Sequence, residues 1–206
     1  MQRAVLEESK PSLRRRLLSA RKLVSPVQHR SWSGLIQESA LRFAPYLAAA
    51  EVALYSPIDT EVDTKAILAH ALTSKKAVFF PKISSDNSGW FFQVAAETDL
   101  ILGRFGIAEP AAGLPLPIRD QECARDTIIF IPGIAFDIGG HRLGRGGGAY
   151  DRMLTALKRR ATFVGLAFEM QILEGLPTEE WDQRIHYVIT EKRIIDCSAS
   201  ASVIEI

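Results

Sequence analysis

The chain has 206 residues, of which 47% are hydrophobic and 24% charged, and its formal net charge is +1. This composition is ordinary for a globular protein and predicts a single domain over residues 1–206, which would bury roughly 70% of the surface of the unfolded chain. The small net charge argues against a protein whose whole surface binds nucleic acid, and no apolar run reaches the roughly 18 residues of a membrane span. We therefore expect a cytoplasmic protein without a signal peptide.

Apolar periodicity and turn residues predict alternating helices and strands along the chain. Helices are expected over residues 9–22, with Ser9 as the N-cap, and over 25–47, 60–72 (with Thr60 as the cap) and 150–160. Strands are expected over 51–57, 76–81, 89–94, 127–132, 162–168 and 186–190, the last of these closing the core. Residues 103–126 contain prolines and little periodicity, which predicts a long surface loop.

Strands that alternate with helices and consist of continuous apolar runs indicate a mostly parallel sheet. Helices on both faces would make this an α/β three-layer sandwich of Rossmann-like type. Ligands of such sheets bind beyond the carboxyl ends of the strands. Three of the predicted strands run into polar or glycine residues, namely Ser56 shortly before Glu61, then Lys82, and Gly133. We expect these strand ends to meet at one edge of the sheet.

The segment HRLGRGGGAYDRML (141–154) combines four glycines with three arginines. It lies between a buried strand and a helix, a position where backbone N–H groups favour phosphate. The segment lacks the GK[ST] of a Walker motif and the spacing of a dinucleotide fingerprint. A flexible turn remains an alternative. Against it, Arg142 and Arg145 within the loop and Asp151 at the helix start favour an anion site with a bridging Mg²⁺.

Basic residues gather at the start of the chain. Residues 1–22 carry a net charge of +5, which leaves −4 for the rest. A solvated basic helix is the simplest interpretation, and anion binding or an organellar transit peptide are the alternatives. Glu7 and Glu8 weaken the transit-peptide interpretation, because such peptides are poor in acidic residues.

Two cysteines, Cys123 and Cys197, lie far apart and form no CxxC motif, and the four histidines show no ligand spacing. We therefore expect neither a disulfide scaffold nor a zinc site.

Five segments together carry a resemblance to a known family. KPSLRRRL, TEVDT, FGIAEP, IPGIAFD and RLGRGGGAYD occur in this order between about residues 10 and 190. They resemble the 5-formyltetrahydrofolate cyclo-ligase family, also called methenyltetrahydrofolate synthetases. The resemblance implies an enzyme that uses ATP and Mg²⁺ to convert 5-formyltetrahydrofolate into 5,10-methenyltetrahydrofolate through a phosphorylated formyl group, releasing ADP and phosphate. It also implies small-molecule partners only, with no nucleic acid and no membrane, and a monomer or homodimer.

The resemblance also assigns roles to individual residues. It implies that Arg145 is catalytic and faces the transferring phosphoryl group, and that Asp151 and Asp182 bind the metal. The implied ATP-binding residues are Lys10, Arg14, Arg142, Leu143, Gly144, Arg145, Gly146, Gly147, Gly148, Ala149 and Tyr150. The implied substrate-binding residues are Ser56, Glu61, Arg145, Gly146, Gly147, Gly148 and Ala149. Arg15 and Arg16 are expected to remain solvated.

Two positions depart from the family's pattern. Ala149 stands where the family usually has a second tyrosine, and His186 stands where an acidic residue often follows the Asp182 position. The Ala149 departure leaves open a nucleotide- or folate-binding regulatory protein without ligase activity. A sugar-phosphate isomerase is a second alternative, since related α/β folds bind sugar phosphates on similar glycine loops. Taken without the family, Glu61 would be a first-turn helix acid and Asp182 a loop aspartate.

Overall fold

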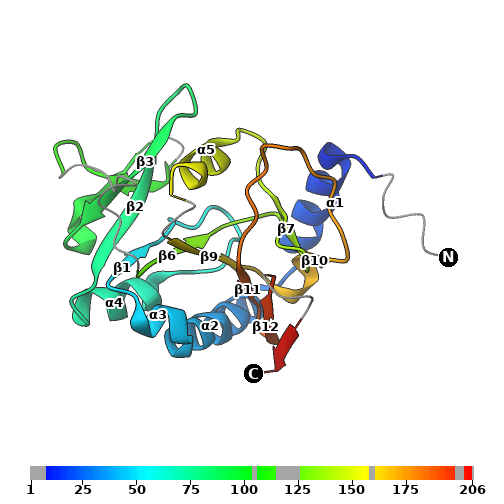
Figure 1. Ribbon diagram of the computed structural model, residues 1–206, viewed down its shortest axis with the longest axis horizontal. Helices are drawn as coiled ribbons and strands as arrows, with labels where there is room; N and C mark the ends of the chain where they lie inside the picture. Colours follow the sequence, from blue (N-terminus) through cyan, green and yellow to red (C-terminus); the bar gives the residue numbers. More distant parts are fainter. Residues whose placement is uncertain (1–7, 104–105, 115–125, 158–160, 198–201, 206) are drawn as a thin grey trace.

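A large twisted sheet runs through the middle of the protein in a computed structural model that describes residues 8–103, 106–114, 126–157, 161–197 and 202–205 (Figure 1). Its strands are β1 (Glu51–Ala53), β2 (Ala77–Ile83), β3 (Gly89–Val94), β6 (Thr127–Ile131), β9 (Ala161–Leu166), β11 (Tyr187–Ile189), β12 (Arg193–Asp196) and β13 (Ser202–Glu205). They lie in the order β13-β12-β11-β9-β6-β1-β2-β3. Antiparallel strands thus extend the sheet on both sides of its parallel centre.

Five central strands, β2, β1, β6, β9 and β11, run parallel to one another, and β3 and β12 pair antiparallel at the two sides. All five residues of β6 are buried, which explains its continuous apolar sequence. Numbered along the chain, the parallel strands follow the doubly wound order 2-1-3-4-5, in which the order reverses between β1 and β6. Ligands of such sheets bind at this reversal, so the fold itself points to the edge beyond Ala53 and Ile131.

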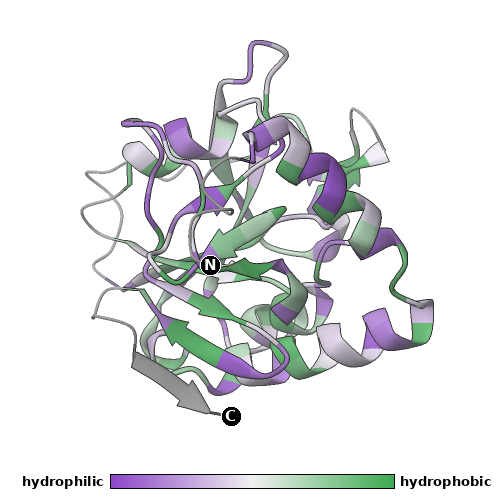
Figure 2. Ribbon diagram, turned by 90° about the vertical axis from the view of Figure 1, so that its right-hand side faces the viewer, coloured by the Kyte–Doolittle hydropathy of each residue, from purple (hydrophilic) through white to green (hydrophobic). Residues whose placement is uncertain are grey.

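Helices cover both faces of the sheet, which confirms the predicted layered α/β architecture. The helices are α1 (Lys10–Lys22), α2 (Pro26–Arg42), α3 (Ala44–Ala48), α4 (Lys65–Thr73) and α5 (Ala149–Thr155). Helices α2, α3 and α4 pack on one face and α5 packs on the other (Figure 1). In the hydropathy view the strands in the middle are mostly green, whereas the helices around them carry purple segments (Figure 2). Among the described residues, no helix is both long and apolar enough to cross a bilayer.

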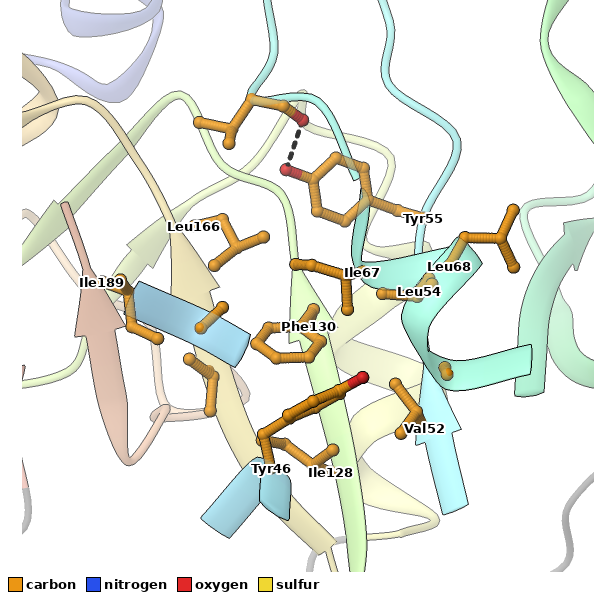
Figure 3. Close-up of a cluster of buried hydrophobic side chains, with 14 of the residues drawn as sticks. Tyr46, Val52, Leu54, Tyr55, Ile67, Leu68, Ile128, Phe130, Leu166 and Ile189 are labelled. Carbon is orange, nitrogen blue, oxygen red and sulfur yellow. Dashed lines mark hydrogen bonds between the residues drawn. The ribbon is translucent and has the colours of Figure 1, made fainter. Parts of the chain in front are cut away.

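The core on the α2–α4 side is closely interlocked (Figure 3). Tyr46 from α3 and Ile67 from α4 lie against Phe130 of β6, and all three are fully buried. Tyr55, just beyond β1, donates its hydroxyl to the backbone oxygen of Val62 at 2.9 Å. This bond ties the chain after β1 to the segment that leads into α4.

Helix α1 packs against a second, smaller sheet rather than against the centre of the large one. Leu13 and Leu17 of α1 share a cluster with residues of β7 (Ala135–Asp137) and β8 (Arg142–Leu143). These strands form a three-stranded sheet with β10 (Ile172–Leu173), and β4 (Leu100–Leu102) pairs with β5 (Ala108–Pro110) in a separate hairpin. The basic helix is thereby held next to the glycine-rich segment that follows β8.

Three element boundaries differ from the sequence prediction. The helix expected over 25–47 ends at Arg42, because Pro45 restarts the chain as α3 after an extended Phe43. The strand expected over 51–57 ends at Ala53, and the helix expected from Thr60 begins only at Lys65. The intervening residues form an irregular loop in which Asp59 has a positive φ of 54°, which a helix does not allow.

The end of the chain and two other segments also differ from expectation. Residues 186–190 do not close the core, since the chain turns at Thr190 into β12, where Ile195 is buried. The loop expected over 103–126 contains β5, and its residues 104–105 and 115–125, Cys123 included, lie outside the described residues. The helix expected over 150–160 ends at Thr155, where a turn follows at residues 156–157, and residues 158–160 lie outside the described part.

Candidate active site

A pocket of about 700 Å³ opens at the reversal between β1 and β6. Tyr55 and Ser56 follow β1 on its floor, and Pro132 and Gly133 follow β6. The tip of the β2–β3 hairpin, the start of α1 and the glycine loop, residues 144–148, also line the pocket. The volume is that of a site for a cofactor-sized or drug-sized ligand.

Every residue that the sequence assigned to ATP, folate or metal binding lines this pocket. The set includes residues as far apart in the chain as Lys10 and Asp182, whose side chains meet across 172 positions. Lys82 was expected at the same edge but is not among the lining residues. Alternate residues of a strand point to opposite sides, so Pro81 and Ile83 line the pocket while Lys82 points away from it. The Lys82 ammonium group instead donates to the Pro110 carbonyl oxygen at 2.7 Å.

The glycine loop lets two arginines lie directly against its backbone. A Cβ atom at Gly144 would stand 2.6 Å from the Arg142 guanidinium, so that position tolerates no side chain without displacing Arg142. Arg14 donates from Nε to the Gly144 carbonyl oxygen at 2.8 Å, and Gly146, beside it, has a positive φ of 106°. Glycine is therefore favoured at Gly146 by the backbone conformation, and at Gly144 it leaves room for the Arg142 guanidinium.

Lys10 and Arg142 are each paired with an aspartate that was predicted to bind metal. Lys10 Nζ lies 2.8 Å from Asp182 Oδ2, and Arg142 Nη2 lies 3.0 Å from Asp151 Oδ1. Burial alone would raise the pKa of Asp182, but hydrogen bonds from Lys10 and the Glu179 N–H outweigh it and hold the pKa below its usual value. The pairs place cations and carboxylates next to each other on one wall.

Arg145 pairs with two further carboxylates, of which Glu61 lines the pocket and Asp59 does not. Its Nη2 atom lies 3.2 Å from Glu61 Oε1 and 3.3 Å from Asp59 Oδ2. Glu61 is only 6% exposed, and its other oxygen accepts the Ile58 N–H at 2.9 Å. Burial raises the pKa of Glu61 above its usual value, and the Ile58 N–H, Arg145 and Arg21 counteract this. The pocket therefore contains a buried carboxylate, Glu61, which is paired with Arg145 of the glycine loop.

Oxygen ligands for a divalent cation are present but sparse. Asp151 and Asp182 both line the pocket, and no group of three or more histidine, cysteine or acidic side chains suited to a metal occurs in the described part of the chain. Mg²⁺ is usually held by one or two carboxylates, with water and substrate phosphates supplying the remaining ligands. Two carboxylates next to a basic loop fit that mode.

Sequence reasoning missed several parts of the site. The tip of the β2–β3 hairpin was given no role in the site, yet Asn87 lines the pocket, and Arg152 donates to the backbone oxygens of Asn87 and Gly147, both at 2.8 Å. The exposed Trp181 at the rim and Arg21 beneath the floor were also not singled out. Arg21 had a detectable signal, since it continues the four-residue spacing of the buried Leu13 and Leu17.

Three other expectations can be checked directly. Arg15 and Arg16 are exposed as predicted, and Arg16 pairs with Glu8 at the surface. His186 plays a structural role, because its Nδ1 accepts the Phe163 N–H at 2.9 Å and joins the start of β11 to β9. His186 is not among the residues that line the pocket.

Comparison with known proteins agrees with this geometry. Residues 6–191 match the profile of the 5-formyltetrahydrofolate cyclo-ligase family. A 5-formyltetrahydrofolate cyclo-ligase of Haemophilus influenzae is 31% identical over 85% of this chain and 94% of its own length, and one of Escherichia coli is 30% identical over 84% and 96%. The NMR structure of Aquifex aeolicus 5,10-methenyltetrahydrofolate synthetase superposes with a TM-score of 0.80 at 32% identity, covering 94% of this chain and 95% of that one. The chain thus belongs to the 5-formyltetrahydrofolate cyclo-ligase family.

Proposed function

We propose that the protein uses ATP and Mg²⁺ to close 5-formyltetrahydrofolate to 5,10-methenyltetrahydrofolate through a phosphorylated formyl group. The family supports the overall conversion, and one observation carries the finer proposal. Arg145 extends from the glycine loop to the buried carboxylate of Glu61, with 3.2 Å between Nη2 and Oε1. A nucleotide bound on the loop and a folate bound at Glu61 would therefore meet at a single guanidinium.

The nucleotide side of the proposal rests on the basic wall. Lys10 and Arg14 stand one helical turn apart on α1 and line the pocket with Arg142. Phosphate oxygens can replace the carboxylates that Lys10 and Arg142 hold, since both kinds of anion accept the same charge-assisted hydrogen bonds. The glycine loop adds a backbone that can approach the phosphates closely.

Asp151 and Asp182 are the residues that would hold Mg²⁺ beside those phosphates. Bound Mg²⁺ supplies neutralisation of the charge that develops on the phosphates. The carboxylates are released for this task when Arg142 and Lys10 turn to the nucleotide.

The folate side of the proposal rests on Glu61 and its neighbours. A buried carboxylate with two acceptor oxygens suits the ring N–H and amino donors of a pterin, because unpaired polar groups are costly at a buried site. Ser56 and Ala149 also line the pocket. In this proposal Glu61, Ser56 and Ala149 orient the bound folate.

The chemistry then consists of two substitutions. The formyl oxygen attacks the γ-phosphorus of ATP, and ADP leaves. The N10 electron pair attacks the formyl carbon, the carbon–oxygen bond to the phosphate breaks, and the N10 proton is lost to solvent. Arg145 is positioned to stabilise negative charge on the transferring phosphoryl group, and the remaining catalysis comes from holding the two substrates in line.

The methenyl product provides the test of this proposal, since it absorbs in the near ultraviolet and the substrate does not. Purified protein incubated with 5-formyltetrahydrofolate, Mg²⁺ and ATP should generate this absorbance together with ADP and phosphate in equal amounts. Product formation at the same rate without ATP would refute the proposed mechanism, and no product under either condition would favour the regulatory alternative.

Asp151→Asn tests the metal assignment. We expect the variant to fold normally and to need more Mg²⁺ for half-maximal activity, because an amide binds Mg²⁺ less well than a carboxylate does. Titration of activity against Mg²⁺ at fixed ATP measures the shift. Glu174→Gln, at an exposed residue outside the pocket, is the matched control. An unaltered Mg²⁺ requirement in Asp151→Asn would move the metal elsewhere.

Ala149→Tyr tests the folate wall. Stacked aromatic contacts contribute about 0.5–1.5 kcal/mol beyond area burial, so the added ring should lower the KM for 5-formyltetrahydrofolate about threefold to tenfold. The KM for ATP should remain nearly unchanged. Steady-state kinetics of the parent and of Ala149→Tyr measure both KM values. If Ala149 instead makes room for a bulkier ligand, tyrosine will block the site and the folate KM will rise.

A further inference from the structure

Arg21 is a buried cation close to the pocket, yet it does not line it. It lies in the last turn of α1 and is 1% exposed. No carboxylate in the described part of the chain lies within ion-pair distance of it, and its Nη2 atom is buried without a hydrogen-bond partner there. A buried guanidinium without a direct counter-ion is unfavourable for folding. Stability alone therefore does not account for it.

The contacts of Arg21 join three segments beneath the pocket floor. Its Nε donates to Thr60 Oγ1 at 2.8 Å, and its Nη1 donates to the Gly133 carbonyl oxygen at 3.3 Å. Thr60 is adjacent to Glu61 in the irregular loop after β1, and Gly133 follows β6. Arg21 thus links α1, which carries Lys10, to both sides of the reversal in strand order.

Arg21 also acts electrostatically on Glu61. The charged groups that act on the Glu61 carboxylate are Arg145 from the pocket side and Arg21, and both favour its ionised form. The phenols of Tyr55 and Tyr150 also lie in its field. Further groups around Glu61 are Asp59, which shares Arg145, and His29, whose Nε2 lies 3.0 Å from the Glu61 backbone oxygen. If a bound nucleotide draws Arg145 away from Glu61, Arg21 still acts on this carboxylate, because it is buried and does not line the pocket.

We propose that Arg21 is a positioning residue for the folate site, which fixes the loop before Glu61 through Thr60 and keeps Glu61 a carboxylate after Arg145 has turned to the nucleotide. The kinetic consequence of this inference rests on the proposed function, whereas its effect on the ionisation of Glu61 does not. Arg21 acts through Glu61 and need not touch either substrate.

Arg21→Met is the direct test, because methionine fills similar space without the charge. We expect the KM for 5-formyltetrahydrofolate to rise about tenfold or more, equivalent to at least one charge-assisted hydrogen bond, while the KM for ATP stays within about twofold. Arg15→Met, at an exposed position of the same helix, is the matched control and should resemble the parent in both constants. Arg21→Lys retains the charge without the forked geometry and should recover part of the folate KM.

A second readout is independent of activity. In protein with ¹³C-labelled glutamate carboxyls, with the Glu61 signal assigned by its loss in Glu61→Gln, the pKa of Glu61 should rise in Arg21→Met and return toward the parental value in Arg21→Lys. This titration remains informative if the parent shows no ATP-dependent turnover, so failure of the proposed function and failure of the Arg21 role are distinguishable.

The outcomes are decisive in either direction. Folded Arg21→Met with parental folate KM and parental Glu61 titration overturns the inference. Should Arg21→Met not fold, Thr60→Val removes the tether and leaves Arg21 in place. A raised folate KM in Thr60→Val then supports the positioning role, and a parental value contradicts it.

Discussion

Replacing Arg145 with alanine should lower kcat by about 100-fold or more while leaving the fold intact, because removing a preorganised charge at a transition state typically costs this much. The side chain is 41% exposed, so its loss creates no buried cavity. It is also the group that lies between the glycine loop and Glu61. The measurement is turnover with both substrates saturating, together with the thermal unfolding temperature.

Two companion variants sharpen this test. Arg145→Lys keeps a cation but loses the forked donor geometry, and should recover only part of the rate. Arg16→Ala removes an exposed arginine that pairs with Glu8 at the surface, and should leave kcat unchanged. Turnover of Arg145→Ala equal to that of the parent would remove this residue from the chemistry.

Replacing Glu61 with glutamine should lower kcat/KM for 5-formyltetrahydrofolate by about 30-fold or more. Glutamine keeps the shape of the side chain but loses its charge, and the loss of a hydrogen bond to a charged, buried acceptor costs about 2 kcal/mol or more. The effect should fall on the folate constants and spare the KM for ATP. A loss of kcat/KM that is confined to ATP would show that Glu61 acts on the nucleotide and not on the folate.

The pH dependence of kcat/KM should identify the same residue. In the proposed mechanism the carboxylate form of Glu61 accepts the substrate's N–H donors, so activity should decline as the pH falls through the Glu61 pKa. Burial raises that pKa above the usual value for glutamate, so the decline should begin at a higher pH than for an exposed glutamate. Glu61→Gln should lack this acidic limb, and an identical limb in both proteins would assign it to another group.

The parallel centre of the sheet could be predicted because its strands are buried on both faces. The strand TIIFI, residues 127–131, is apolar throughout and was placed almost to the residue. The presence of the glycine loop and Asp151 in the pocket could likewise be predicted, since their residue types are unusual and lie next to each other in the sequence. Local sequence patterns were therefore sufficient where a structural feature is formed by one continuous segment.

The irregular segment between β1 and α4 could not be predicted in this way. The sequence there favours a longer strand and an earlier helix, but tertiary hydrogen bonds decide the outcome. Thr64 binds the Tyr55 carbonyl oxygen, and Thr60 accepts from Arg21 rather than capping a helix. Such partners are remote in sequence, and the helix therefore begins at Lys65.

The pairing of site residues also lay beyond local patterns. Lys10 and Asp182 are brought together only by the packing of α1 against the small sheet. Arg21 appeared as one more charge in a basic helix, although its spacing from Leu17 marked it as buried. The resemblance to a family supplied Asp182 as a candidate and gave no indication of Arg21.

Transfer of the formyl oxygen to phosphate is the central claim, and isotope labelling tests it most directly. 5-Formyltetrahydrofolate carrying ¹⁸O in the formyl group is converted with ATP and Mg²⁺, and the released phosphate is analysed by mass spectrometry. We predict one ¹⁸O atom in each phosphate released with the methenyl product. Phosphate without the label, formed together with the methenyl product, would show that the formyl oxygen leaves by another route and would contradict the mechanism assigned to this pocket.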